Sequence, residues 1–200
     1  QRIRMLAELV KLRQACCNPK LVMAETTIPS AKLAALDALL EELKLNNHKA
    51  LIFSQFVGHL QLIKQHLEDK GFDYQYLDGS TPQKQRQASV NAFQRGQGDI
   101  FLISLKAGGS GLNLTAADYV IHMDPWWNPA VEEQASDRAH RIGQLRPVTI
   151  YRLITQNTIE EKIVALHKQK RDLADNLLAG NEASAKLSVD DMLNLLKETF

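Results

Sequence analysis

From residue 50 onward, short apolar runs rich in β-branched residues alternate with longer stretches whose apolar side chains recur every three or four positions. The short runs predict strands, and the longer stretches predict amphipathic helices. We expect the strands at residues 50–54, 72–77, 100–104, 119–123 and 148–154. Such alternation is typical of βαβ units, in which right-handed crossovers join parallel strands. The predicted fold class is therefore α/β, a parallel sheet sandwiched by helices.

Capping residues mark the helix boundaries of this core. Gly71 follows a basic last turn and predicts the end of the first helix. Thr81 and Pro82 predict the start of the next helix, with the hydroxyl as its cap and the proline at the first helical position. Asn128 and Pro129 predict the start of a third helix in the same way.

Both ends of the chain add helices to the core. An amphipathic helix over residues 3–12 should stop near Asn18, and Ser30 should cap the helix that follows. Thr158 begins a predicted capping box, in which Glu161 reaches back to the cap. Residues 181–200 read as a polar linker and a short terminal helix.

Composition narrows the class of protein. The chain has 200 residues, with 24 Lys and Arg against 23 Asp and Glu, so its formal charge is +1. This net charge predicts no overall electrostatic attraction to nucleic acid or to a membrane. No run reaches the roughly 18 apolar residues of a membrane span, and the polar start lacks a signal peptide. Cys16 and Cys17 are adjacent, which gives neither a disulfide framework nor a CxxC metal spacing. We expect an intracellular protein without a membrane partner, in which the two cysteines form the buried end of a helix.

The loop that follows the third predicted strand is rich in glycine. In an open parallel sheet, ligands bind beyond the carboxyl ends of the strands. Residues 104–113 place Gly108, Gly109 and Gly111 close to Lys106. Exposed amides beside an ammonium group suit phosphate. The loop is neither a Walker A loop nor a complete GxGxxG motif, and a flexible turn is the structural alternative.

A second candidate lies downstream, in residues 134–144. If the helix from Pro129 continues, Gln134, Arg138 and Arg141 share one face, and guanidinium groups there match phosphate oxygens. The alternative is a solvent face of salt bridges with neighbouring acids. His140 has no partner at metal-binding spacing, so the sequence assigns no metal ligand.

Both tryptophans of the chain, Trp126 and Trp127, lie in one loop between two prolines. A presented indole is a stacking surface for bases or sugars, and the structural alternative is an apolar plug. We expect one of the two rings in the core and the other at the surface.

The order of these segments resembles the C-terminal RecA-like lobe of the Swi/Snf family of superfamily-two ATPases, the helicase-like DNA translocases. Residues 5–165 carry the resemblance, and Asn18 stands where histidine is common. The matching segments are residues 12–19 (the segment between the lobes), 50–56 (motif IV), 77–81 with Arg86, 104–113 (motif V), 127–129 (the tryptophan block) and 134–144 (motif VI). The resemblance implies a RecA-like, P-loop NTPase-like second lobe with extra helices at both ends.

In this family ATP with Mg²⁺ binds between two lobes. The resemblance implies that Arg138 and Arg141 are arginine fingers with Gln134 beside them. Gly109, Gly111 and Asn113 would lie near the ribose and phosphates. The positions implied for contact with double-stranded DNA are Ser54, Gln55, Gly79, Arg86, Ser104, Lys106 and Trp127.

Two motor motifs are missing from this sequence. There is no GxxxxGK[ST], and the only DxxH lies inside the arginine block, from Asp137 to His140. We therefore expect the phosphate loop, the Mg²⁺ ligand and the catalytic base in a first lobe upstream of Gln1, as the start at glutamine suggests. The whole protein would be a DNA-dependent ATPase, and this chain alone would be inactive.

The expected partners are DNA, the N-terminal lobe of the same polypeptide, and a protein–DNA complex as the remodelling target. The expected division is residues 1–29 (inter-lobe brace), 30–156 (RecA-like lobe), 157–180 (brace helix) and 181–200 (linker and short helix). The alternative function is a nucleic-acid-binding module without an ATP role. A small-molecule α/β enzyme fits poorly because no nucleophile and base stand at neighbouring strand ends. The compact core without insertions favours the bacterial cytoplasm or nucleoid over the nucleus.

Overall fold

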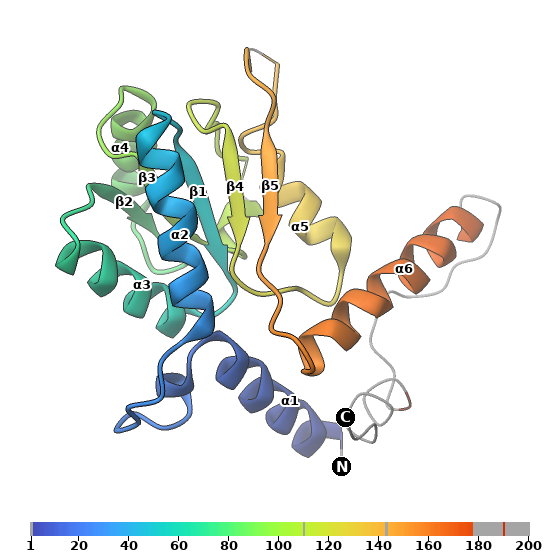
Figure 1. The fold of residues 1–200 in the computed structure, drawn as a ribbon. Helices are drawn as coiled ribbons and strands as arrows, with labels where there is room; N and C mark the ends of the chain where they lie inside the picture. Colours follow the sequence, from blue (N-terminus) through green and yellow to red (C-terminus); the bar gives the residue numbers. More distant parts are fainter. Residues whose placement is uncertain (1, 110, 143, 178–189, 191–200) are drawn as a thin grey trace.

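The computed structural model describes residues 2–109, 111–142, 144–177 and 190. Five strands form one sheet in the order β2-β3-β1-β4-β5, and every pair of neighbours is parallel. The strands are β1 (Ala50–Ser54), β2 (Tyr74–Leu77), β3 (Ile100–Ser104), β4 (Tyr119–His122) and β5 (Thr149–Arg152). Helices lie on both faces of this sheet (Figure 1). The predicted α/β class, with a parallel sheet between helices, is confirmed.

The edge strands are shorter than the apolar runs predicted. β2 was expected from residue 72 but begins at Tyr74, which pairs with Ile100, the first residue of β3. The run predicted at 148–154 is paired only over β5, where Arg152 is opposite His122 at the end of β4. An edge strand has a single neighbour, so it ends where the neighbour ends.

One face of the sheet is covered by α2 (Ala31–Leu45) and α3 (Val57–Asp69). Their leucines and isoleucines pack on the strand side chains that point to that face. The buried members of this cluster include Leu36, Leu40, Ile52, Leu60, Ile63 and Leu102. Because β1 is central and covered on both faces, all five of its residues are buried.

The opposite face is covered by α4 (Gln83–Gln94) and α5 (Pro129–Ser136). Phe93 of α4 meets Phe101 of β3 edge to face, with ring centres 5.3 Å apart. Ala135 of α5 joins the same cluster, which also buries Phe53. α5 therefore packs directly on the sheet, which fixes the position of both of its ends.

The two terminal helices, α1 (Arg2–Cys17) and α6 (Ile159–Leu177), lie beyond the carboxyl edge of the sheet (Figure 1). Met5 and Leu9 of α1 pack with Ile159 and Ile163 of α6 in a separate small cluster. Two short 3₁₀ helices, η1 (Pro19–Leu21) and η2 (Ala107–Gly109), complete the described elements. Within these residues, no helix is long and apolar enough to cross a bilayer.

Several predicted boundaries are confirmed. α1 ends at Cys17, directly before Asn18, and Ser30 caps α2 by accepting a hydrogen bond from the Leu33 amide. Gly71 follows the last turn of α3 with a φ of 74°, a conformation that glycine adopts at little cost. Asn128 caps α5 through the Ala130 amide.

One predicted cap is wrong, and another is confirmed with a different glutamate as partner. Thr81 does not cap α4, because its hydroxyl accepts a hydrogen bond from the Asp78 amide and closes the preceding turn. At α6 Thr158 is the cap, as predicted, because its hydroxyl accepts a hydrogen bond from the Glu160 amide. The capping box is not formed as expected, because the carboxylate that reaches back is that of Glu160 rather than Glu161, and it accepts from the Thr155 amide. The terminal helix expected within residues 181–200 lies outside the described residues.

Candidate functional site

Glycine is required for different structural reasons at different positions of the loop after β3. A Cβ placed on Gly108 would lie 2.6 Å from a ring carbon of Phe53, so this glycine is required by packing. Gly111 has a φ of +77°, which disfavours residues with a side chain. Gly109 lies at the end of η2. Close packing therefore explains one glycine, and an unusual backbone conformation explains another.

The loop meets the arginine block beyond the end of α5. The Leu114 amide donates a hydrogen bond to the Arg138 carbonyl at 2.9 Å, and a Cβ on Gly111 would lie 3.8 Å from Arg138 Nη1. Beside this contact, an open depression of about 670 Å³ is lined by Asn113, His140, Arg141 and Ile142. The structure thus brings together two segments that the sequence only suggested separately.

The arginines are positioned by turns and not by a helical face. The condition for a shared helical face, that the helix from Pro129 continues through Arg141, is not met, because α5 ends at Ser136. Arg138 Nε donates to the Gln134 carbonyl at 3.1 Å, which orients the buried guanidinium group. Gln134 and Arg141 are exposed.

No carboxylate of the described residues forms an ion pair with Arg138 or Arg141. Burial lowers the pKa of Arg138 and the charge of Arg141 lowers it further, whereas the charge of Asp137 partly offsets both effects. Glu132 of α5 is buried and lies 3.1 Å from Arg152 Nη2. Two neighbouring guanidinium groups that form no ion pair with a carboxylate of the described residues favour binding of an anion such as phosphate.

A second group of predicted residues lies at the carboxyl edge of the sheet. Lys106 and Gly79 are exposed there, and Gln55 is half-buried. Arg86 is also half-buried, and its guanidinium group donates to the carbonyls of Thr81, Asp78 and Gly79. Arg86 therefore fixes the loop that presents Gly79.

The side chains of Ser54 and Ser104 do not fit the expected contact with DNA. Both residues are buried, with 1% and 4% of their surface exposed. The Ser54 hydroxyl donates to Asp124 Oδ1 at 2.5 Å, and the Ser104 hydroxyl accepts from the Ala107 amide at 3.4 Å. These hydroxyls shape the ends of β1 and β3 from the inside.

The expectation of one core tryptophan and one presented tryptophan is wrong. Both rings are half-buried: Trp126 packs on the cluster under α5, and Trp127 packs on the cluster between α1 and α6. The Arg13 guanidinium lies 5.4 Å from the Trp126 ring and 4.9 Å from the Trp127 ring. His167 of α6 hydrogen-bonds the Trp126 carbonyl. The tryptophan loop is therefore clamped between both terminal helices.

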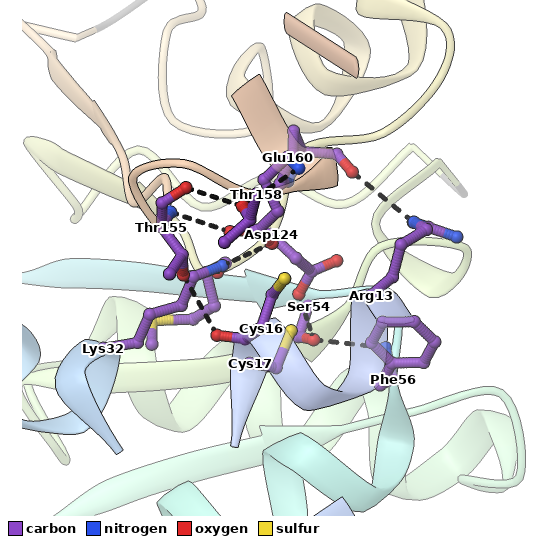
Figure 2. A network of polar contacts seen from close by, with 12 residues as sticks. Arg13, Cys16, Cys17, Lys32, Ser54, Phe56, Asp124, Thr155, Thr158 and Glu160 are labelled. Atoms are coloured by element: carbon purple, nitrogen blue, oxygen red, sulfur yellow. Dashed lines mark hydrogen bonds and ion pairs between the residues drawn. The ribbon is translucent and has the colours of Figure 1, made fainter. Parts of the chain in front are cut away.

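A buried polar network supports this clamp (Figure 2). Lys32 Nζ donates to Glu160 Oε2 at 2.6 Å and to the Met123 carbonyl at 2.5 Å. Glu160 Oε1 accepts from the Thr155 amide, and the Thr155 hydroxyl donates to the Cys16 carbonyl. The network joins α1, α2, α6 and the segment that follows β4.

Sequence reasoning missed the charged members of this network. Arg13 lies four residues after Leu9 and four before Cys17, so it continues the buried stripe of α1. Lys32 lies four residues before Leu36, so it belongs to the buried stripe of α2. A charged residue in phase with an apolar stripe is the signal that could have identified both.

The sequence of this lobe matches a known protein family. Residues 31–143 match the family described as the helicase conserved C-terminal domain. The chain belongs to this family. The chain is 41% identical over 196 residues to a putative ATP-dependent helicase/translocase, YwqA, of Bacillus subtilis, covering 95% of this chain and 21% of the relative.

Eukaryotic relatives match as well. The chromatin-remodelling ATPase INO80 of Schizosaccharomyces pombe is 45% identical over 162 residues, covering 80% of this chain and 10% of the relative. The mouse SWI/SNF-related matrix-associated actin-dependent regulator of chromatin subfamily A member 1 is 38% identical over 213 residues, covering 98% of this chain and 20% of the relative. The crystal structure of the C-terminal part of the Fun30 ATPase domain matches with a TM-score of 0.67 and 35% identity, over 91% of this chain and 56% of that chain.

These comparisons confirm a RecA-like C-terminal helicase lobe of the Swi/Snf type. The chain spans about a fifth or less of the length of these curated relatives. The preference for a bacterial over a nuclear location is contradicted, because the compact lobe matches a chromatin-remodelling ATPase of fission yeast as well as a Bacillus protein. A compact core does not separate the two groups.

Proposed function

We propose that this chain is the second motor lobe of a DNA-dependent ATPase that translocates along double-stranded DNA. The observation that carries the proposal is the hydrogen bond from the Leu114 amide to the Arg138 carbonyl at 2.9 Å, which holds the glycine loop against the arginine block beside a depression lined by Asn113 and Arg141. Relatives named as ATP-dependent helicases and chromatin-remodelling ATPases support the same function. ATP would bind between this depression and the N-terminal RecA-like lobe of the same polypeptide.

The residues around the depression suit the phosphates of ATP. Arg138 and Arg141 would stabilise the charge that develops on the transferred phosphoryl group, with Gln134 beside them. Arg138 is oriented by its Nε hydrogen bond, whereas exposed Arg141 can adjust to the nucleotide. Asn113 lines the depression and, with the loop glycines, would face the ribose and phosphates.

The same residues do not suit Mg²⁺. The metal prefers carboxylate and phosphate oxygens, and the residues that line the depression are Asn113, His140, Arg141 and Ile142. We therefore assign the protein ligands of Mg²⁺, the phosphate loop and the catalytic base to the N-terminal lobe. This chain alone would not hydrolyse ATP.

The carboxyl edge of the sheet would contact DNA. Lys106 and the loop at Gly79 are exposed there, and half-buried Trp127 lies two residues before α5. Contacts of these kinds go mostly to the sugar–phosphate backbone, which suits movement along DNA without sequence preference. By analogy with the named remodellers, the target on the DNA would be a protein–DNA complex.

Replacement of Arg141 tests the nucleotide role. In the intact protein, Arg141→Ala should reduce DNA-stimulated ATP hydrolysis by at least a hundredfold. The Kd for DNA should change less than threefold. Arg95→Ala, which removes an exposed arginine after α4, is the matched control and should leave both quantities unchanged.

The alternative is a nucleic-acid-binding module in which the arginines have no ATP role. Weaker DNA binding by Arg141→Ala with unchanged hydrolysis per bound DNA would favour that alternative. Inactivity of the isolated chain is a separate test. DNA-stimulated ATP turnover by the purified 200-residue chain would contradict it.

A further inference from the structure

Three buried donor atoms from distant parts of the sequence meet at the end of α1. The Cys17 sulfur, a ring nitrogen of His59 and a carboxylate oxygen of Asp124 all lie within 4.8 Å of one another. Cys17 ends α1, His59 is in the first turn of α3, and Asp124 follows β4. Their exposed fractions are 1%, 0% and 3%.

His59 is the member of this cluster that needs an explanation. Neither of its ring nitrogens has a hydrogen-bond partner in the described part of the chain, although the residue is completely buried. A buried polar group without a partner destabilises the fold. A neutral imidazole nitrogen is, however, a good metal ligand.

We propose that Cys17, His59 and Asp124 bind a zinc ion. Thiolate sulfur, imidazole nitrogen and carboxylate oxygen are the zinc ligands of proteins, and three protein ligands with one water form a common site. Three atoms within 4.8 Å of one another share a point at most about 2.8 Å from each. Zinc bonds are about 2.0–2.3 Å long, so movements of less than about 1 Å complete the site.

The surroundings of Asp124 resemble the second shell of a metal site. Ser54 Oγ donates to one carboxylate oxygen at 2.5 Å, and the Gln55 amide donates to the other at 3.2 Å. Hydrogen bonds of this kind fix the orientation of a ligating carboxylate. Each oxygen keeps a further lone pair for the ion.

The charges around the cluster limit the affinity for a cation. Arg13 and Lys32 act electrostatically on Asp124 and oppose zinc, whereas Asp124 and Glu160 favour it. Binding also converts the Cys17 thiol into a thiolate and releases its proton to water. Because two cationic groups oppose binding of the ion, we expect a site that a strong chelator empties.

Zinc at this position would fasten α1 to the core. Cys17 lies one helical turn after Arg13, and Asp124 lies two residues before Trp126. The ion would join the end of α1 to α3 and to the segment after β4. It would therefore stabilise the side of the fold that holds the tryptophan loop.

Metal content tests the site without any measurement of activity. The protein is purified without a metal-chelating tag and analysed by inductively coupled plasma mass spectrometry, with one zinc per chain expected. Replacement of zinc by Co²⁺ should give a sulfur-to-cobalt charge-transfer band. Cys17→Ser and His59→Gln should lose the band. Cys16→Ser, the matched control at a half-exposed cysteine outside the cluster, should retain it.

The wild-type protein also gives a test that does not depend on folded variants. A strong chelator should lower its Tm by several degrees, and added Zn²⁺, but not Mg²⁺, should restore it. Folded wild-type protein without zinc, without a cobalt band and with a Tm indifferent to chelator would overturn the proposal. So would a cobalt band that survives in folded Cys17→Ser.

Discussion

The guanidinium carbon of Arg13 lies 4.9 Å from the centre of the Trp127 ring. It also lies 5.3 Å from the Phe56 ring, and its Nη2 donates to the Pro125 carbonyl at 3.4 Å. Burial lowers the pKa of Arg13, an effect that the charge of Asp124 partly offsets. A planar cation among aromatic faces keeps its charge with little water. The position of α1 therefore determines the position of the tryptophan loop.

Replacement of Arg13 should loosen this loop. Arg13→Ala should lower the free energy of unfolding by about 2 kcal/mol or more, because both the cation–π contacts and the packing are lost. Lys11→Ala on the exposed side of the same helix should change it by less than about 0.5 kcal/mol. Urea denaturation followed by circular dichroism measures both. Equal stability of the two variants would show that the aromatic contacts do not stabilise the fold.

Gly108 should tolerate alanine only when space is made for it. Gly108→Ala places a methyl group against Phe53 and should destabilise the lobe by about 1–3 kcal/mol. Phe53→Leu in the same chain should recover part of this loss, whereas it should not rescue Gly111→Ala. A double-mutant cycle of thermal or urea unfolding measures the coupling. Additive effects of Gly108→Ala and Phe53→Leu would contradict the packing explanation.

Lys106 should contribute one phosphate contact. Lys106→Ala in the intact protein should weaken DNA binding to a similar extent for all sequences and reduce the slope of log K against log salt by about 1. Arg95→Ala, a change of equal charge after α4, should leave the slope unchanged. Fluorescence anisotropy at several salt concentrations gives the slope. An unchanged slope for Lys106→Ala would place the DNA elsewhere.

Removal of one partner of the buried Lys32–Glu160 ion pair should strongly lower the free energy of unfolding. Lys32→Met leaves a buried carboxylate without its cation, and should cost about 3–5 kcal/mol. Lys32→Met with Glu160→Gln should cost less than the sum of the two single changes. The exposed pair of Lys11 and Glu8, 3.9 Å apart, is the control and should show coupling below about 0.5 kcal/mol. Similar coupling in both pairs would contradict a special role for the buried one.

The layers of the fold could be predicted from the sequence because apolar side chains report burial directly. The run from Ala50 to Ser54 is apolar on both faces, as a central parallel strand must be. The ends of β2 and β5 could not be predicted, because pairing with β3 and β4 decides them.

The end of α5 could not be predicted either, since tertiary contacts determine it. The Leu114 amide binds the Arg138 carbonyl, and the Gln144 side-chain amide donates to the carbonyls of Thr115, Ala117 and Ala139. These contacts turn the chain after Ser136, where sequence periodicity alone favours a longer helix. The arginines were found by residue type, but their geometry comes from residues outside their own segment.

The candidate metal ligands could not be predicted from the spacing of residues along the sequence. Cys17, His59 and Asp124 are separated by 40 residues or more, so no short motif contains them. His59 does lie four residues before Ile63 and eight before Leu67, on the buried stripe of α3. That phase predicts a buried histidine, but only the fold shows what surrounds it.

The shortness of α5 has a thermodynamic consequence for the proposed motor. The helix has eight residues and is therefore about 12 Å long. Trp127 stands just before it and Arg138 just after it, and a rod of this length packed on the sheet transmits a displacement from one end to the other. Whatever factor DNA gives to the affinity for nucleotide, nucleotide must give the same factor to the affinity for DNA. The increase in ATP affinity caused by DNA and the increase in DNA affinity caused by ATP would then report the same coupling free energy.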